Sequence, residues 1–525
     1  MEIPRLKKEL PIGIPTLGEI VNYNRVYIDK TPFISKLMTG KYYFLSRPRR
    51  FGKSLFLDTL KQAFLGNKSL FKGLHLENNW NWDKTYPVIH ISFASETHNV
   101  NFLEKNMHSI LNESIKSFEL HTILDEELIN TKFKLLIEQL SSKYNQQVVI
   151  LVDEYDKPIL DNLENSDNAA YARSLLKSLY SVIKDSDQYL KFVFLTGVSK
   201  FSKAGLFSGL NNLNDITLDA QYADICGYTQ ADLEREFSDY LIEGKVDKAK
   251  LKRWYNGYNF SGSEAQKVYN PFDILLFFNK GFQYRDYWFE TGNPQFLIKL
   301  IQKNKYYFPN MEGVIIKENM LSSFDLDNIS LPVLLFQTGY LTIKSITTLG
   351  TQFAYVLGYP NAEVKASLND KLAAIATTPE RKEALLGRLN DCLLSSNMSE
   401  IGNIFQSHFA SIPHDWYRNN DIQHYEGFYA SIIYSCFCAL GYTVIAEDNT
   451  NTGQMDLAVI VPDKILILEF KLKKNGDAAS ALQQIKDKKY PDKYVAQGKQ
   501  IYLLGISFDP EARNVHDFLS EQYNN

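Results

Sequence analysis

The sequence predicts an α/β protein with several domains, and three observations lead to this prediction. First, short apolar segments typical of buried strands alternate with helical patterns through the first 200 residues; these segments are 42–45, 88–93, 148–152 and 192–196. Such alternation favours a parallel sheet with helices on both faces. Second, the pattern changes near residue 222 to helices and aromatic-rich turns. Third, two apolar strands that carry acids and lysines follow near the C-terminus, at 453–460 and 464–471.

The length of the chain sets the number of domains, since 525 residues are too many for one hydrophobic core. We expect a parallel-sheet domain with a helical lid at 1–285. A winged-helix-like unit is expected at 286–360, where a helix, Gly339 and a strand follow one another. A helical connector at 361–400 then leads to a second α/β domain at 401–525.

Composition and charge place the chain among ordinary globular proteins, with 45% hydrophobic and 22% charged residues. The net charge of −4 gives no overall field that attracts nucleic acid, so binding would need a local basic patch. Two sets of residues qualify, although a solvated face is the simpler explanation of each. They are Lys41, Arg47, Arg49, Arg50 and Lys53, and Lys486, Lys488, Lys489 and Lys493.

The cysteines and the N-terminal residues bear on the cellular compartment. The four cysteines show neither zinc-ligand spacing nor a disulfide framework. Residues 1–5 lack the apolar core of a signal peptide, and no apolar stretch is long enough to span a bilayer. We therefore expect a cytoplasmic protein without a membrane partner.

A phosphate-binding loop is predicted at residues 46–54, between an apolar strand and a helix. Backbone N–H groups at a helix N-terminus attract anions, and Gly52 lets the backbone approach closely. Lys53 would supply a charge to the terminal phosphates and Ser54 a hydroxyl to Mg²⁺. Arg47 stands where the usual pattern has its first glycine. The predicted nucleotide-binding residues of the loop are Arg49, Arg50, Phe51, Gly52, Lys53 and Ser54.

Two later strands would complete this site. The apolar run 148–152 leads directly into Asp153 and Glu154. Asp153 would hold Mg²⁺, and Glu154 would polarise the attacking water. The alternative is an ordinary acidic turn. The strand at 192–196 ends in small polar residues, of which Thr196 or Ser199 would contact the γ-phosphate, unless this too is an ordinary turn.

Four segments resemble the AAA-ATPase-like family of P-loop proteins, within the wider AAA and STAND group. They are YIDKT (27–31), RPRRFGKS (47–54), LVDEYDKP (151–158) and LTGVSKFS (195–202). The resemblance covers roughly the first 280 residues and implies ATP as cofactor, hydrolysed with Mg²⁺. The arginine at 47 is similar to that family's own variant of the loop. The sequence leaves open whether Arg49 and Arg50 contact phosphate or nucleic acid, or instead pair with Asp29 or Asp156. We assign no arginine finger.

The C-terminal strands carry a second candidate site. Asp456 and Glu469 lie thirteen positions apart, which suits two adjacent strands joined by a tight turn at 462–464. Both carboxylates would then meet at one divalent ion. Because side chains alternate along a strand, Lys471 shares a face with Glu469 and would orient water or stabilise the transition state at phosphorus.

Three further residues are assigned to this metal site. Glu426, at the start of an apolar helix, would add a third carboxylate, and the carbonyl of Phe470 would be another metal ligand. Gln484, on a later helix, would orient the site or contact a phosphate. His414 and His424 are near in sequence but receive no role.

The set Glu426, Asp456, Glu469-x-Lys471 and Gln484 resembles the PD-(D/E)xK nuclease superfamily, across about residues 400–525. Met455 stands where that superfamily has a variable proline. The resemblance implies a restriction-endonuclease-like α/β domain that cuts nucleic acid with Mg²⁺, or with Mn²⁺. The alternative is that these residues persist in a domain that binds without cutting.

The leading functional prediction is an ATP-dependent or ATP-regulated nuclease acting on nucleic acid, expected to be DNA, in defence or DNA maintenance. Two alternatives remain: an ATP-driven switch whose nuclease-like domain only binds, and an NTPase with a protein partner. The oligomeric state stays open between a monomer and a homo-oligomer. Base stacking by the aromatic residues 254–260 is weighed against core or lid packing, which we favour.

Overall fold

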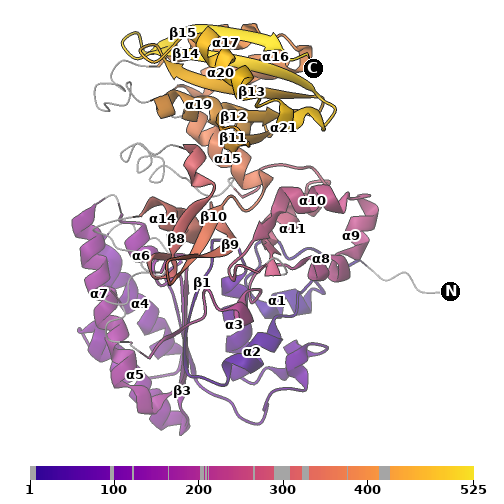
Figure 1. Ribbon diagram of the computed structural model, residues 1–525. Helices are drawn as coiled ribbons and strands as arrows, with labels where there is room; N and C mark the ends of the chain where they lie inside the picture. The colour runs from indigo at the N-terminus through magenta and orange to yellow at the C-terminus, as the bar shows by residue number, and fades with distance from the viewer. Residues whose placement is uncertain are drawn as a thin grey trace, which may run out of the picture. The chain divides into compact units, whose positions relative to one another are not determined.

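The computed structural model describes residues 7–94, 100–120, 123–163, 165–200, 206, 210, 212–263, 266–288, 308–321, 330–374, 377–412 and 426–524. The chain divides into two compact units (Figure 1). The first contains Met1–Trp288 and Val314–Asn361, and the second contains Phe289–Gly313 and Ala362–Asn525. Residues 286–360 are therefore shared between the units, and the helical region 361–400 belongs to the second unit.

A parallel five-stranded sheet forms the centre of the first unit, as predicted. Its strands are, in spatial order, β2 (Val88–Ser92), β3 (Val148–Asp153), β4 (Leu190–Gly197), β1 (Tyr42–Ser46) and β5 (Asn214–Asp215). Strands β1 and β3 are buried along their whole length, which explains their unbroken apolar sequences.

Helices cover both faces of this sheet. Figure 1 shows α4 (Val100–Ser117), α5 (Ile129–Tyr144) and α7 (Ser166–Asp185) on one side. On the other side lie α1 (Leu17–Asn22), α2 (Thr31–Leu37) and α3 (Lys53–Phe64).

The register of the strands brings their carboxyl ends to one edge. Ser46 pairs with Gly197, Leu45 with Thr196, and Ser92 with Asp153. Strand β4 lies between β1 and β3, so Thr196 stands between the strand that leads into the phosphate loop and the strand that ends in acids. Ligands bind at this edge in open α/β sheets.

The helical part of the first unit is built around aromatic side chains. Its helices are α8 (Gln230–Glu236), α9 (Ser238–Glu243), α10 (Lys248–Tyr255) and α11 (Pro271–Asn279), with the small sheet β6 (Asn256–Tyr258) and β7 (Val268–Tyr269). Tyr255, Tyr258 and Phe260 are buried. Core packing, the favoured interpretation of the 254–260 cluster, is therefore what the structure shows for these three rings.

The described part of residues 314–361 forms two helices and an antiparallel sheet of three strands. The elements are β8 (Val314–Lys317), α13 (Glu318–Leu321), α14 (Leu331–Thr338), β9 (Thr342–Leu349) and β10 (Gln352–Gly358), and the sheet order is β8-β10-β9. The predicted helix, glycine turn and strand are present as α14, Gly339 and β9. Residues 289–307, also predicted helical, lie outside the described residues.

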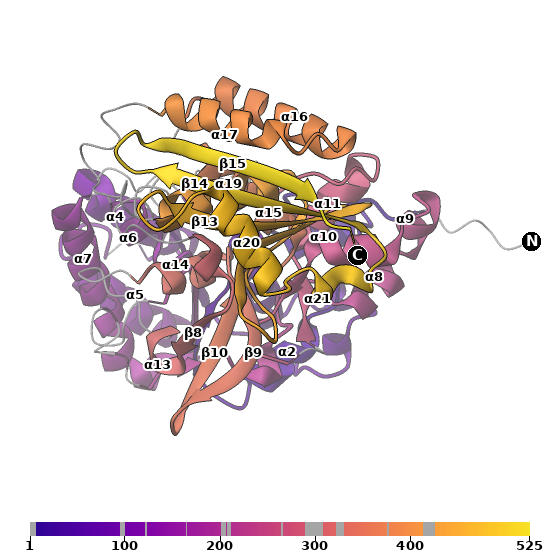
Figure 2. The same cartoon turned by 45° about the horizontal axis from the view of Figure 1, so that its top comes forward.

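The second unit is a mixed sheet with helices on both faces. Its strands are β11 (Thr443–Asn449), β12 (Gln454–Ile460), β13 (Lys464–Leu472), β14 (Gln500–Asp509) and β15 (Asn514–Gln522), in that spatial order. Only the β13–β14 pair is parallel. The helices are α15 (Ala362–Ala373), α16 (Pro379–Ser395), α17 (Glu400–Ala410), α19 (Glu426–Ala439), α20 (Ala478–Asp487) and α21 (Asp492–Val495). Figure 2 shows α16 and α17 on one side of the sheet and α20 on the other.

Alternation along β13 separates two cores in this unit. Leu466, Leu468 and Phe470 face the core that contains α17 and α19, whereas Ile465 and Ile467 face α20. Among the described residues, no helix is both long enough and apolar enough to cross a membrane. All four cysteines are buried and free, and free cysteine packs as a small apolar side chain.

Candidate functional site

The phosphate-binding loop turns between β1 and α3 with its backbone in left-handed conformations. Gly52, the N-cap of α3, has a φ of 93°, and Arg50 has a φ of 67°. Lys53 begins the helix and is only 7% exposed. Its Nζ donates to the carbonyls of Arg47 and Pro48, each at 2.8 Å. Burial lowers the pKa of Lys53, and the nearby charge of Asp153 opposes that shift.

Arg47, in the place of the usual first glycine, anchors the loop. It is fully buried, and its guanidinium donates to the carbonyls of Ser46, Thr217 and Tyr222. The same group lies 4.1 Å from the ring centroid of Phe260, and burial lowers its pKa to about 10. Sequence reasoning found only the departure from the glycine pattern, because all but one of these partners are distant in sequence.

The three residues before Gly52 have different surroundings. Arg49 is exposed, whereas the Arg50 guanidinium lies 3.8 Å from the ring centroid of Phe272. The ring of Phe51 is buried and packs edge-on against Tyr258. A contact between Phe51 and phosphate would therefore have to use its backbone N–H.

Asp29 and Asp156, the alternative pairing partners considered for these arginines, have other contacts. Asp29 accepts from the N–H and hydroxyl of Thr31 and from the N–H of His75. Asp156 accepts from the N–H groups of Val198 and Ser199. Both carboxylates therefore hold local backbone in place.

The acids after β3 stand at the carboxyl edge of the sheet. Asp153 Oδ1 accepts from the N–H of Glu154, whose φ of 53° is unusual for a non-glycine residue. Glu154 Oε2 is buried without a hydrogen-bond partner, and so is the hydroxyl of Thr196. Burial, and then the charge of Asp153, raises the pKa of Glu154. Buried polar atoms without partners are costly, so this edge fits a polar ligand such as a nucleotide with its Mg²⁺.

Asp156 fastens the loop after β3 to the loop after β4. Besides the two backbone groups, it accepts from the Ser199 hydroxyl at 2.6 Å, and the Tyr155 hydroxyl donates to the Ser199 carbonyl. Burial raises the pKa of Asp156. Since Ser199 is engaged in this way, Thr196 is the better placed of the two candidates for a ligand contact.

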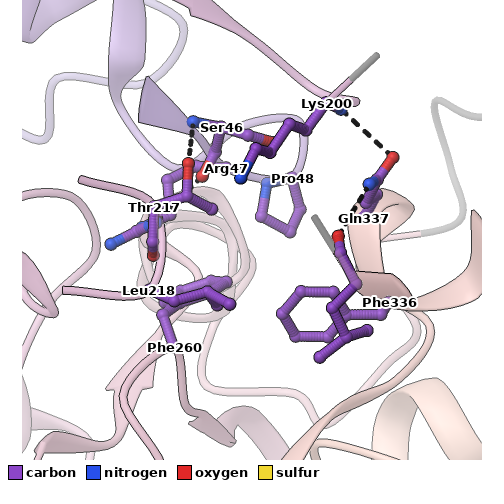
Figure 3. Close-up of a pocket in the computed structure, with 10 residues that line it drawn as sticks. Ser46, Arg47, Pro48, Lys200, Thr217, Leu218, Phe260, Phe336 and Gln337 are labelled. Atoms are coloured by element: carbon purple, nitrogen blue, oxygen red, sulfur yellow. Dashed lines mark hydrogen bonds between the residues drawn. The ribbon is translucent and has the colours of Figure 1, made fainter. Parts of the chain in front are cut away.

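A small cavity lies between the phosphate-binding loop and α14 (Figure 3). Its volume is about 10 Å³, room for about one water and far too little for a nucleotide. The Gln337 Oε1 accepts from the N–H of Lys200 at 3.2 Å, and its Nε2 donates to the Leu321 carbonyl at 3.3 Å. The contacts on this side of the loop are therefore structural.

In the second unit, the pairing of Leu457 with Leu468 places Asp456 opposite Glu469, where β12 and β13 end their ladder. Asp456 Oδ2 accepts from the N–H of Phe470 at 2.7 Å. Glu469 Oε1 accepts from Lys471 Nζ at 3.1 Å and from the Gln484 amide. The structure thus brings Asp456, Glu469, Lys471 and Gln484 together.

Electrostatics at this site favour a cation. Glu469 is 2% exposed, and its Oε2 is buried without a hydrogen-bond partner. Burial, and then the charge of Asp456, raises the pKa of Glu469; burial also raises the pKa of Asp456. Two acids this close disfavour each other's charge, and a divalent ion relieves that repulsion. The residues present therefore fit Mg²⁺ or Mn²⁺.

Glu426 begins α19 and lies to one side of this pair. Its Oε2 accepts from the N–H of Leu472 at 3.0 Å, and burial, followed by the charge of Asp456, raises its pKa. Within the described ranges, no three His, Cys, Asp or Glu side chains are grouped closely enough to hold a metal. Direct ligation by Glu426 and by the Phe470 carbonyl stays a prediction, and His414 and His424 lie outside the described residues.

Comparison with known proteins identifies the families of the two domains. Residues 11–207 match the family model described as a predicted AAA-ATPase, and residues 424–518 match that of the PD-(D/E)XK nuclease superfamily. A protein of Azotobacter chroococcum mcd 1, described as "Uncharacterized protein in vnfD 5'region", is 46% identical over 520 residues. The match covers 98% of this chain and 99% of that protein. The chain belongs to the AAA-ATPase-like family, with a PD-(D/E)XK nuclease-superfamily domain.

Both resemblances inferred from the motifs are thereby confirmed. In this AAA-ATPase-like protein, Lys53, Asp153 and Thr196 all lie at the carboxyl edge of the first sheet. In its PD-(D/E)XK domain, the two strand acids lie opposite each other, as their spacing predicted. Sequence reasoning missed the anchoring of Arg47 and assigned no function to Asp156.

Proposed function

We propose that the protein is an ATP-dependent or ATP-regulated, Mg²⁺-dependent nuclease that acts on nucleic acid, with DNA as the expected substrate. The observation that carries the proposal is the buried, unpartnered oxygen of Glu469, opposite Asp456 and beside Lys471. An acid pair with an adjacent ammonium suits phosphodiester hydrolysis. The cytoplasm, where ATP and DNA are both found, is the proposed place of action.

In the nuclease domain, Asp456 and Glu469 would hold the divalent ion, together with the Phe470 carbonyl. The ion supplies a water activated as a nucleophile and neutralises charge on the scissile phosphate. Lys471, held against Glu469 at 3.1 Å, would place a positive charge beside a phosphate bound there. The Gln484 amide keeps the Glu469 carboxylate in one orientation.

In the ATPase domain, Lys53 at the start of α3 would bind the terminal phosphates, and Ser54 and Asp153 would hold Mg²⁺. Bound phosphate oxygens would compete with the loop carbonyls for the Lys53 ammonium. Glu154 would accept a proton from the attacking water, and Thr196 would contact the γ-phosphate from the adjacent strand. The Gly52 backbone and exposed Arg49 complete the proposed site.

The test is a cleavage assay on DNA and RNA substrates with Mg²⁺ or Mn²⁺, each with and without ATP. The wild type should cut, and Lys471→Ala should cut at least a hundredfold more slowly, a loss typical of removing one charge-stabilising group. Lys474→Ala is the control for general loss of positive charge, since Lys474 is exposed nearby in sequence. Equal products from the wild type and Lys471→Ala would support the binding-only alternative.

The proposed biological roles are defence against foreign DNA or DNA maintenance. Stimulation of ATP hydrolysis by nucleic acid would support either role. Failure of every DNA and RNA tested to stimulate hydrolysis would favour an NTPase with a protein partner. Light scattering of the protein, with and without nucleic acid, would distinguish a monomer from a homo-oligomer.

A further inference from the structure

Another acid, Glu447 on β11, lies between two residues that pair with the neighbours of Asp456. Ala446 pairs with Leu457 and Asp448 pairs with Met455, so Glu447 and Asp456 occupy facing positions between these two pairs. Glu447 is exposed, and its backbone carbonyl accepts from the Gln454 side chain at 3.0 Å. Facing residues on antiparallel strands have Cβ atoms about 5 Å apart in regular sheets.

At Glu447 and Asp456, both β11 and β12 switch the side of the sheet to which their alternate side chains point. Met455 packs in the core beside α20, yet Leu457 packs in the opposite core, although residues two apart on a regular strand share a face. On β11, Ala446 packs against the core that holds Leu457. Asp448 instead bonds to Tyr494, which belongs to the α20 core.

The change of face uses an unusual backbone at Glu447, with a φ of 48°. Glycine, asparagine and aspartate adopt this left-handed region more readily than glutamate does. Opposite it, the Asp456 carboxylate reaches the N–H of Phe470 on β13.

We propose that Glu447 is an outer-sphere acid of the metal site, accepting hydrogen bonds from water bound to a divalent ion held by Asp456 and Glu469. This inference rests on the proposed nuclease function. The independent sign of a ligand is the buried, unpartnered Glu469 oxygen. Direct ligation by Glu447 is not proposed, since the described residues contain no group of three such ligands. Mg²⁺ commonly retains several waters and uses only one or two carboxylates, which leaves room for an acid of this kind.

The test is Mn²⁺ binding to the nucleotide-free full chain, measured by calorimetry and by electron paramagnetic resonance of free Mn²⁺. Glu447→Asn and Glu447→Asp form a matched pair, because both residues tolerate a positive φ and only aspartate keeps a carboxylate. Glu447→Asn should raise the Kd about tenfold, as losing an outer-shell partner does. Glu447→Asp should stay much closer to the wild type. The melting temperature without metal should not fall in either variant.

Controls separate this inference from the proposed function. Asp463→Asn removes an exposed acid from the turn between β12 and β13 and should leave the Kd unchanged. Asp456→Asn should abolish binding. If the wild type binds Mn²⁺ through Asp456 but Glu447→Asn and Glu447→Asp bind it equally well, the role of Glu447 is wrong and the metal site stands. If the wild type binds no Mn²⁺, both proposals fail.

Discussion

Glu154, the residue proposed to accept a proton from water, has an unusual local environment. Its backbone has a positive φ, and one carboxylate oxygen is buried without a partner. Such strain and unsatisfied polarity are concentrated at functional sites. Burial raises the pKa of Glu154, which suits a group that accepts a proton during hydrolysis.

Changing Glu154 to glutamine should leave ATP binding intact and slow hydrolysis by a factor of about 100 to 10,000, the usual contribution of a general base. Binding of a fluorescent ATP analogue and release of phosphate would measure the two steps separately. Glu138→Gln, on the outer part of α5, is the control and should change neither quantity. Hydrolysis at the wild-type rate by Glu154→Gln would contradict the proposed role of this carboxylate.

His408 makes a prediction about stability and pH. It lies on α17, is 5% exposed, and burial lowers its pKa to about 4 from 6.5. Between those pH values the unfolded chain binds a proton that the folded chain excludes, so stability falls as the pH falls. The loss should reach about 3 kcal/mol.

Chemical denaturation of the wild type and His408→Leu at pH 7 and pH 5 would measure this effect. The variant should lose less unfolding free energy than the wild type between the two pH values. The exposed His516 provides the control, since His516→Gln should keep the wild-type dependence. An identical pH dependence in His408→Leu and the wild type would contradict the assignment.

At the scale of elements, α14 is packed against the phosphate-binding loop. Gly339 ends α14 with a φ of 92°, and a Cβ placed there would lie 2.8 Å from the Cβ of Pro48. Gly350, in the turn between β9 and β10, also has a positive φ, but a Cβ there would meet nothing within 4 Å. The two glycines therefore separate backbone strain from the contact with the loop.

Gly350→Ala should cost about 1 kcal/mol of unfolding free energy, from backbone conformation alone. Gly339→Ala should cost about 3 kcal/mol, because overpacking against Pro48 adds to that strain. It should also weaken ATP binding, since the loop must shift. Denaturant titration and nucleotide binding would measure both effects; equal behaviour of the two variants would show that the Pro48 contact does not matter.

Most elements could be predicted from the sequence because their signals are local. Strands β1, β3 and β4 are mostly apolar runs, and the acids Asp153 and Glu154 come at the end of β3. The thirteen-residue spacing was enough to place Asp456 opposite Glu469. Arg47 was harder to interpret, since two of its partners, Thr217 and Tyr222, follow it by about 170 residues.

Glu447 was missed for a related reason. The sequences of β11 and β12 give no sign that both strands break the regular alternation of side chains at the same position. That change depends on which core takes Met455 and Leu457, and on the bond between Asp448 and Tyr494. These are tertiary contacts, which local patterns do not encode.

At the scale of the whole molecule, the proposed ATP site and the proposed metal site belong to different compact units. Residues 314–361 return to the first unit after 289–313 have joined the second. Glu312, in the segment 289–313, accepts a hydrogen bond from Lys365 at 2.7 Å within the second unit. A division of the gene into two fragments at a single position would therefore remove native residues from at least one unit.

Nicking of a supercoiled plasmid with Mg²⁺ and ATP, by the full-length wild type, Asp456→Asn and Asp463→Asn, is the most direct test of the central claim. Both changes replace one carboxylate by an amide, but only Asp456 lies opposite Glu469. We expect the wild type and Asp463→Asn to nick at the same rate and Asp456→Asn not to nick. Equal nicking by all three proteins, or none by the wild type with either Mg²⁺ or Mn²⁺, would contradict it.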